Sequence, residues 1–411
     1  MSAISPKPYT LRNTIQHYAW GAQNGSAFIP KLLGVPAEPG VPYAEMWMGA
    51  HPTAPSSVVT ESGRVPLDAW IARNPEAILG QAVASRFDAK LPFLLKVLSI
   101  GHPLSIQAHP SKAQAEALHA RDPEHYPDNN HKPEIAIALE GLTALVGVKP
   151  LSELVKTLRT YPEIAAFIGA DTTARVTDAV GLGSAEADVR VRRIFSALIE
   201  RARAEPQALS ETIATLDQRF NRPHRAAGEI ERLFVDLAVE YPDGDLGLLI
   251  LFLLNLVHLE PGQAVYTPAG VPHVHLSGSV VECMAASDNV VRAGLTPKFK
   301  DSETLLEIMD ARPRPVAITS SDPEAEETIY TTPAVEFEVT RWRLQRGKQY
   351  RQVTNERPSI LLATAHKVLL SWPTGTRYLK QGQSVLIPAS VPWYTLTSQL
   401  SAEVFRATVP L

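Results

Sequence analysis

Short apolar runs separated by turn-forming residues dominate the first part of the chain. Residues 92–100 (PFLLKVLSI) and 103–108 (PLSIQA) are two such runs, and residues 122–132 (DPEHYPDNNHK) form a polar segment rich in Pro, Asp and Asn. Runs of this length between turn formers are typical of β-strands and loops. We therefore expect residues 8–150 to be mostly β-structure.

The pattern changes between residues 151 and 255, where Ala, Arg, Glu and Leu dominate. Val191, Ile194, Phe195 and Leu198 recur at the spacing that places side chains on one face of a helix. We expect a helical domain here, and we interpret it as a structural insertion without a chemical role.

The β pattern returns after residue 255 and contains an internal repeat. Residues 262–273 read GQAVYTPAGVPH and residues 382–393 read GQSVLIPASVPW, with identical Gly, Gln, Val, Pro, Ala, Val and Pro. In each copy a strand would end at the Pro-Ala turn and another would begin after Val-Pro. This arrangement resembles a motif of the cupin double-stranded β-helix, a jelly-roll barrel. Trp393 takes the place of His273 in the second copy, so we expect the chemistry in the first barrel.

These patterns predict a mainly β protein with two cupin-like double-stranded β-helix barrels and an α-helical insertion. The catalytic barrel would be discontinuous, with residues 1–150 and 256–320. Residues 151–255 would form the helical domain. Residues 321–411 would form the second, non-catalytic barrel.

Four residues of the first barrel are candidate metal ligands. Gln107 and His109 are two residues apart, which places both on one face of a strand. Glu134 belongs to the next predicted strand, and His273 begins the strand after the Val-Pro turn. Two imidazole nitrogens and two oxygens suit a borderline cation such as Zn²⁺.

A competing site and a binding-only function are also consistent with the pattern. His273, His275 and Glu282 have the HxH…E spacing of cupin dioxygenases, which bind non-haem iron with two His and one carboxylate. A sugar-binding cupin without activity is a third alternative, but it would not need the four candidate ligands together.

Further charged residues of the same region suggest an anionic substrate. Clustered cations bind phosphate, and carboxylates can transfer protons. The candidate cations are Lys96, Lys132, Arg292 and Lys298, and the candidate carboxylates are Glu45 and Glu282.

Composition narrows the possible partners and location. The 411-residue chain has a formal net charge of -4 and no basic stripe, which argues against nucleic acid. Cys283 is the only cysteine, which fits a reducing compartment. The longest apolar run, residues 246–254, is much shorter than the ~20 residues that span a bilayer, and the N-terminal residues carry no signal-peptide pattern. We expect a cytoplasmic monomer that binds neither nucleic acid nor membranes.

Several long segments resemble the type I mannose-6-phosphate isomerases. The resemblance weakens in the helical part and beyond about residue 305. The matching segments are HYAWG at 17–21, YAEMWMGAHP at 43–52, LPFLLKVL at 91–98, PLSIQAHP at 103–110, NHKPEIAIAL at 130–139 and ECMAASDNVVRAGLTPKFKD at 282–301.

This resemblance implies the interconversion of mannose 6-phosphate and fructose 6-phosphate, a reaction of carbohydrate metabolism on the route to GDP-mannose. It implies one Zn²⁺ per chain. The implied ligands are Gln107, His109, Glu134 and His273, and the implied pocket residues are Trp20, Glu45, Lys96, Ser105, Lys132, Glu282, Arg292 and Lys298. His275 departs from the family, which usually has Tyr at this position, and we place it with the substrate-binding residues.

Within the implied pocket we assign roles as hypotheses. Glu282 would be the base, and Arg292 with the metal would stabilise the enediolate. Lys132 and Lys96 would contact ring oxygens or neutralise charge. Ser105 and Lys298 would bind the phosphate.

Overall fold

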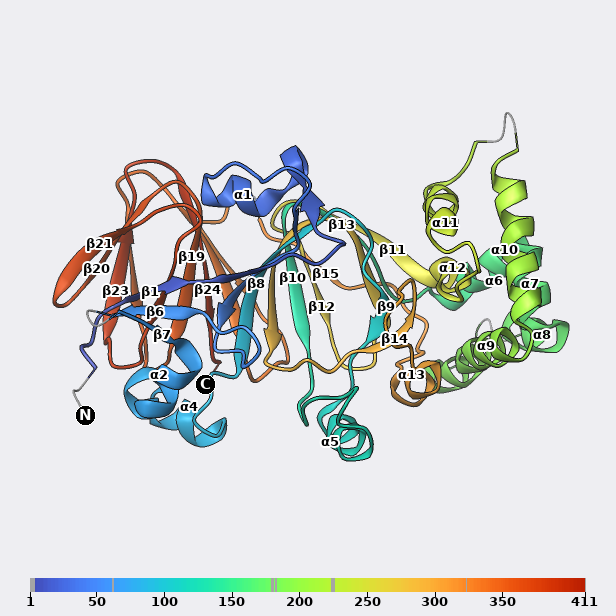
Figure 1. Cartoon of the computed structure of the whole chain (residues 1–411), viewed down its shortest axis with the longest axis horizontal. Coiled ribbons are helices and arrows are strands. Elements are labelled where there is room, and N and C mark those ends of the chain that lie inside the picture. The colour runs from blue at the N-terminus through green and yellow to red at the C-terminus, as the bar shows by residue number, and fades with distance from the viewer. Residues whose placement is uncertain are drawn as a thin grey trace.

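The computed structural model describes residues 4–60, 63–178, 181, 183–222, 226–322 and 324–410, and it is mainly β. Figure 1 shows two β assemblies side by side, with helices α6 to α12 grouped at one end of the molecule and the C-terminal strands at the other. None of the helices in the described residues is both long enough and apolar enough to cross a membrane.

The larger sheet carries most of the predicted site residues. Within the described residues it has ten strands, with the main order β15-β12-β10-β13-β8-β5-β2, while β11 pairs with β10, and β9 pairs with β13 and β14. The strands are β2 (Thr14–Gln16), β5 (Glu45–Gly49), β8 (Phe93–Ile100), β9 (Ile106–Ala108), β10 (Glu134–Val148), β11 (Leu254–Leu259), β12 (Ala264–Thr267), β13 (His273–Ala285), β14 (Val291–Gly294) and β15 (Ile318–Thr319).

Two further sheets make up the second β assembly. The eight-stranded sheet has the order β16-β17-β24-β19-β22-β1-β6-β7, and the four-stranded sheet has the order β18-β23-β20-β21. The strands of the first are β1 (Tyr9–Arg12), β6 (Ser57–Thr60), β7 (Gly63–Pro66), β16 (Glu327–Tyr330), β17 (Glu338–Leu344), β19 (Ser359–Ala365), β22 (Ser384–Ile387) and β24 (Ala402–Thr408). Those of the second are β18 (Gln349–Val353), β20 (Val368–Trp372), β21 (Gly375–Leu379) and β23 (Trp393–Thr397). A short pair, β3 (Ala22–Gln23) and β4 (Pro42–Tyr43), lies apart from them.

Helices occur in three places. The first group precedes or interrupts the larger sheet: α1 (Phe28–Leu33), α2 (Leu67–Arg73), α3 (Pro75–Leu79), α4 (Gln81–Arg86) and α5 (Lys112–Arg121). The second group is consecutive: α6 (Leu151–Thr160), α7 (Pro162–Ile168), α8 (Ala170–Thr177), α9 (Ser184–Ala204), α10 (Pro206–Phe220), α11 (Glu229–Glu240) and α12 (Gly247–Ile250). Finally, α13 (Ser302–Ile308) follows β14.

The second group of helices buries an aromatic core. Phe167, Phe195, Phe220, Phe234 and Phe252 are all buried in one cluster with the aliphatic residues of these helices. Burial of such large apolar side chains is the main source of stability for helices of this length. The helical spacing seen in the sequence therefore corresponds to a packed helical unit beside the larger sheet.

The strand–turn–strand prediction for the sequence repeat is confirmed. β12 and β13 surround the first Val-Pro turn, and β22 and β23 surround the second. The repeat glycines make matching contacts, since Gly262 donates from its backbone N to Ala138 O at 2.8 Å and Gly382 does the same to Ala363 O at 2.8 Å. Their φ angles of 88° and 75° lie in the left-handed region that favours glycine.

One strand pairing joins segments that the sequence assigned to different barrels. β1 pairs with β22 and with β6, so an N-terminal strand lies inside the sheet formed mainly by C-terminal residues. Tyr9 pairs with Leu386 and Leu11 pairs with Val58. The chain therefore passes through the second β assembly before it enters the larger sheet.

Candidate metal centre and active site

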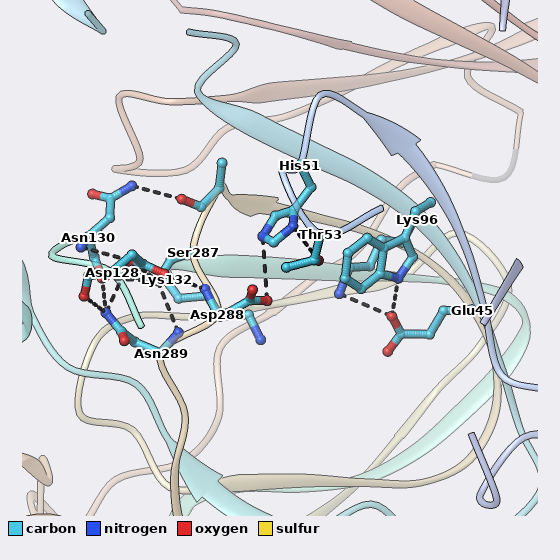
Figure 2. A network of polar contacts seen from close by, with 12 residues as sticks. Glu45, His51, Thr53, Lys96, Asp128, Asn130, Lys132, Ser287, Asp288 and Asn289 are labelled. Atoms are coloured by element: carbon cyan, nitrogen blue, oxygen red, sulfur yellow. Dashed lines mark hydrogen bonds and ion pairs between the residues drawn. The ribbon is translucent and has the colours of Figure 1, made fainter. Parts of the chain in front are cut away.

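Lys96 is the centre of a buried charged group on one face of the larger sheet. It lies directly opposite Glu282 of β13 and Trp47 of β5, and directly paired residues of antiparallel strands share a face. Lys96 Nζ is 3.5 Å from Glu282 Oε2 and 3.3 Å from Glu45 Oε2. The ammonium also lies 4.9 Å from the Trp47 ring centroid, and Trp47 Nε1 donates to Glu45 Oε2. Figure 2 shows Lys96 beside Glu45.

Burial and neighbouring charges both shift the pKa values of Lys96 and Glu282. Burial acts to lower the pKa of Lys96, but the carboxylates of Glu45 and Glu282 raise that pKa above its ordinary value. Burial, followed by the charge of Glu134, raises the pKa of Glu282 to about 7. This buried group therefore holds a charged ammonium next to a carboxyl group whose affinity for a proton is raised.

A second buried group consists of His109, Glu134 and His273, whose possible ligand atoms all lie within 4.8 Å of one another. Glu134 Oε2 is 3.4 Å from His109 Nε2, and Glu134 Oε1 is 3.0 Å from His273 Nε2. His109 directly follows β9, Glu134 begins β10 and His273 begins β13. The structure therefore brings together three of the four ligands that the sequence suggested.

The hydrogen bonds made by Nδ1 of the two rings orient their Nε2 atoms toward this carboxylate. His109 Nδ1 is 2.9 Å from Asn289 O, and His273 Nδ1 is 2.9 Å from Val271 O. A carbonyl oxygen only accepts, so each Nδ1 carries a proton, and in the neutral form of each ring Nε2 keeps its lone pair. His109 Nε2 is buried and makes no hydrogen bond. A cation placed between the two Nε2 atoms and the carboxylate would be coordinated by all three groups.

Gln107, the fourth candidate ligand, lies beside this group in the sheet. It lies directly opposite His273 of β13 and Arg292 of β14. Its Nε2 is 3.4 Å from His273 Nε2, and its Oε1 is 3.4 Å from Ser105 Oγ. A half-turn of the amide would bring the oxygen to the His273 side and leave Nε2 facing the hydroxyl of Ser105, which can accept. Gln107 is therefore positioned to offer an oxygen to the same centre.

Lys132 and His275 border these two groups. Lys132 Nζ is 3.6 Å from Glu134 Oε2 in a buried position. Possible ligand atoms of His275, Glu134 and Glu282 lie within 4.8 Å of one another. Burial lowers the pKa of His275 to about 4, so this ring is neutral at pH 7. Among the described residues, no such cluster contains His273, His275 and Glu282 together.

Arg292 and Lys298 lie close enough to influence one another. Burial lowers the pKa of Lys298, and the charge of Arg292 lowers it further. Lys298 Nζ lies 5.5 Å from the Tyr18 ring centroid, and that ring lies 6.0 Å from the ring of Trp20. The N-terminal loop with Trp20 and the loop after β14 therefore approach each other near the two cations.

Sequence reasoning missed a polar network that holds His109 in place. Asp128 accepts hydrogen bonds from Ser287 Oγ at 2.8 Å, from the backbone N of Asp288 at 2.8 Å and from Asn289 Nδ2 at 3.1 Å. Figure 2 shows these residues converging from two loops. The network fixes the backbone carbonyl of Asn289, to which His109 Nδ1 donates.

His51 and Asp288 were missed as well. His51 Nε2 is 3.4 Å from Asp288 Oδ1, and His51 Nδ1 is 2.9 Å from Thr53 Oγ1. The His51 ring packs edge-on against Trp47 at 5.0 Å. Both residues lie inside segments that resemble the isomerases, which was the one signal that pointed to them.

The model of the family "Phosphomannose isomerase type I, catalytic domain" matches residues 9–151. The mannose-6-phosphate isomerase of Rattus norvegicus is 37% identical over 94% of this chain and 97% of that protein. The chain belongs to the mannose-6-phosphate isomerase family. Its human relative of the same name is 36% identical over 90% of each chain.

Solved structures of the family share the fold. A variant of phosphomannose isomerase from Salmonella typhimurium has a TM-score of 0.85 and 31% identity, covering 98% of this chain and 100% of that one. A zinc-bound mannose 6-phosphate isomerase has a TM-score of 0.85 and 30% identity over the same shares. These comparisons do not favour the oxygenase alternative.

Proposed function

We propose that this chain is a zinc-dependent aldose–ketose isomerase that interconverts mannose 6-phosphate and fructose 6-phosphate through a cis-enediol. The observation that carries the proposal is the pair of buried groups on one face of the larger sheet. One group offers metal ligands, and the other holds an ammonium between two carboxylates. Family membership supplies the reaction and the substrate.

Gln107, His109, Glu134 and His273 would hold one zinc ion per chain. Support comes from the unpartnered Nε2 of buried His109 and from the matching orientation of His273. When bound, zinc would act as a Lewis acid on a substrate oxygen. With a single carboxylate among its four ligands, the site would keep a net positive charge and would therefore favour an oxygen ligand.

Glu282 would move the proton between C2 and C1 of the open-chain sugar. It is buried, and Lys96 lies directly opposite it in the sheet. A C–H proton next to a carbonyl is weakly acidic, so a base succeeds only if the developing charge on oxygen is stabilised. The metal and Arg292 would supply that stabilisation, and Lys96, 3.5 Å from the Glu282 carboxylate, would neutralise charge beside the base.

The remaining cations would stabilise charge and bind the phosphate. Arg292 lies directly opposite Gln107 and would face the developing enediolate. Lys132 would contact a ring oxygen. Ser105 and Lys298 would bind the phosphate, because a dianion needs both a cation and hydrogen-bond donors.

Glu45, Trp20 and His275 would border the sugar. Glu45 bonds to both Lys96 and Trp47, so it orients the charged group. His275 is neutral and lies near Glu134 and Glu282, so it would present a ring nitrogen to a hydroxyl group.

We also propose the architecture behind this site. Residues 1–150 and 256–320 would form a catalytic cupin barrel, 151–255 a helical domain, and 321–411 a second cupin-like barrel without activity. The matching contacts of the two repeat glycines support a duplicated barrel. The pairing of β1 with β22 means that the N-terminal segment also contributes to the second barrel. That the enzyme is a cytoplasmic monomer stays a prediction.

The test is a coupled assay with mannose 6-phosphate before and after removal of the metal. We expect activity in the purified protein, loss of activity with a chelator, and recovery when zinc is restored. A protein that retains full activity without metal would exclude the zinc-dependent reaction. A metal-loaded protein without activity on either sugar phosphate would exclude the isomerase.

A further inference from the structure

Leu295 has a backbone conformation that leucine rarely adopts. Its φ angle is 55°, in the left-handed region, and it directly follows β14. Such a conformation is costly for a residue with a Cβ and persists only where neighbouring contacts impose it. Leu295 begins the loop of residues 295–300, which carries Lys298. The feature that imposes this conformation therefore also sets the path of the loop.

Asp245 supplies that contact from the helical unit. It lies between α11 and α12, and its side chain is buried. Its Oδ1 accepts hydrogen bonds from the backbone N of Leu295 and of Gly247, both at 2.8 Å. Its Oδ2 accepts from Lys300 Nζ at 2.8 Å. One carboxylate thus holds the first and the last residue of the loop.

Two glycines allow the carboxylate to come this close. A Cβ on Gly294 would lie 2.4 Å from Asp245 Oδ1 and 2.7 Å from the backbone N of Gly247. A Cβ on Gly247 would lie 2.8 Å from the same oxygen and 3.0 Å from the backbone N of Leu295. Gly294 and Gly247 therefore let the backbones of β14 and α12 come together around the Asp245 carboxylate.

The same loop is also tied back to β14, the strand that carries Arg292. The backbone N of Asp301 donates to Arg292 O at 3.1 Å, which closes the loop onto the strand that carries Arg292. Within the loop, the backbone N of Lys298 donates to Thr296 Oγ1 at 3.1 Å. Lys298 therefore lies near a second cation, Arg292, whose charge lowers its pKa.

We propose that Asp245 is a positioning residue for phosphate binding: through Leu295 and Lys300 it holds Lys298 where the substrate phosphate binds. The proposal rests on the proposed function. It gives the helical unit, which the sequence suggested to be chemically silent, an indirect part in substrate recognition. Asp245 itself does not touch the substrate.

The experiment measures phosphate binding and catalysis in the zinc-loaded protein. Inorganic phosphate binding is followed by calorimetry, and KM and kcat are measured with mannose 6-phosphate. In Asp245→Asn and in Lys300→Met we expect the Kd for phosphate and the KM to rise roughly tenfold, because a charge-assisted hydrogen bond is lost. The kcat should change much less, and the zinc content should stay unchanged.

Three further variants separate positioning from general destabilisation. Lys300→Arg keeps the charge and should bind phosphate nearly as the original chain does. The double variant of Asp245 and Lys300 should bind phosphate about as Asp245→Asn alone does, because the contact between the two side chains is already lost in the single variant. Glu163→Gln is the matched control, because Glu163 Oε2 bonds to Arg219 at 2.7 Å in the same helical unit. It should leave KM unchanged.

Unchanged phosphate binding and KM in both single variants would overturn the proposal. If Asp245→Asn does not fold, Lys300→Met decides alone, because Lys300 is exposed. The unmodified protein also distinguishes this proposal from the proposed function. A chain that binds phosphate but does not isomerise mannose 6-phosphate contradicts the isomerase, whereas an active chain with unaffected variants contradicts only the role of Asp245.

Discussion

The imidazole of His109 donates a hydrogen bond from Nδ1 to the backbone carbonyl of Asn289, at 2.9 Å and in a fully buried position. This contact joins a metal-ligand candidate at the end of β9 to the loop between β13 and β14. Asp128 in turn holds the segment that carries this carbonyl. It accepts hydrogen bonds from Ser287, Asp288 and the side chain of Asn289. Metal binding should therefore depend on a residue that cannot reach the metal.

The first prediction concerns Asp128. Asp128→Asn removes the charge that holds three donors, so the carbonyl that orients His109 loses its support. We expect zinc affinity to fall by roughly 10- to 100-fold, as for other residues that orient metal ligands, measured by competition with a chelator. Asp122→Asn in the same polar segment is the control, because Asp122 contacts His125 instead. Equal zinc affinity in the Asp128 variant and the original chain would refute this dependence.

Glu282 gives the second prediction. Glu282→Gln keeps the size of the side chain but removes the base, so kcat should fall by roughly 10²- to 10⁴-fold. Zinc content, measured by elemental analysis, should be unchanged because Glu282 is not one of the four proposed ligands. A kcat close to that of the original chain would remove Glu282 as the proton-transfer group.

The third prediction concerns His275, which departs from the family. His275→Tyr should retain isomerase activity and zinc content, because the proposed site does not use this ring as a ligand. Steady-state kinetics and metal analysis measure both. Loss of the metal in this variant would instead assign His275 to the metal centre, as the oxygenase alternative requires.

The fourth prediction concerns the second β assembly and the number of zinc ions that each chain binds. Trp393 takes the place of His273 in the repeat, and Ser359 takes the place of Glu134, since each lies four residues before the alanine that contacts a repeat glycine. Val353 pairs with Trp393 as Gln107 pairs with His273. A histidine alone cannot restore such a site. The Trp393→His variant should therefore still bind one zinc ion per chain. A second bound zinc ion per chain would contradict this expectation.

The sequence predicted the parts of the site that depend on local spacing. Gln107 lies on β9 and His109 directly follows its last residue, and the repeat located His273 at a strand start. The exposed helix α5 was not anticipated. Its buried positions are only Ala115 and Leu118, so its apolar stripe is weak, and a capping box of Ser111 and Gln114 defines its start.

Contacts between distant loops could not be predicted in this way. Asp128 meets Asn289 across 161 residues, and Asp245 meets Lys300 across 55. Neither contact follows a repeating sequence pattern, because each contact depends on loop conformation and on strand packing. The pairing of Tyr9 with Leu386 has the same origin, since no local signal distinguishes the sheet that an N-terminal strand joins.

Nuclear magnetic resonance of mannose 6-phosphate incubated with the zinc-loaded protein in D₂O tests the proposed isomerisation and its proton transfer together. We expect fructose 6-phosphate to appear, with deuterium at C1 where the proton passes through a base that exchanges with solvent. The chelated protein should produce none. Unchanged mannose 6-phosphate in the presence of the zinc-loaded, folded protein would contradict the isomerase function.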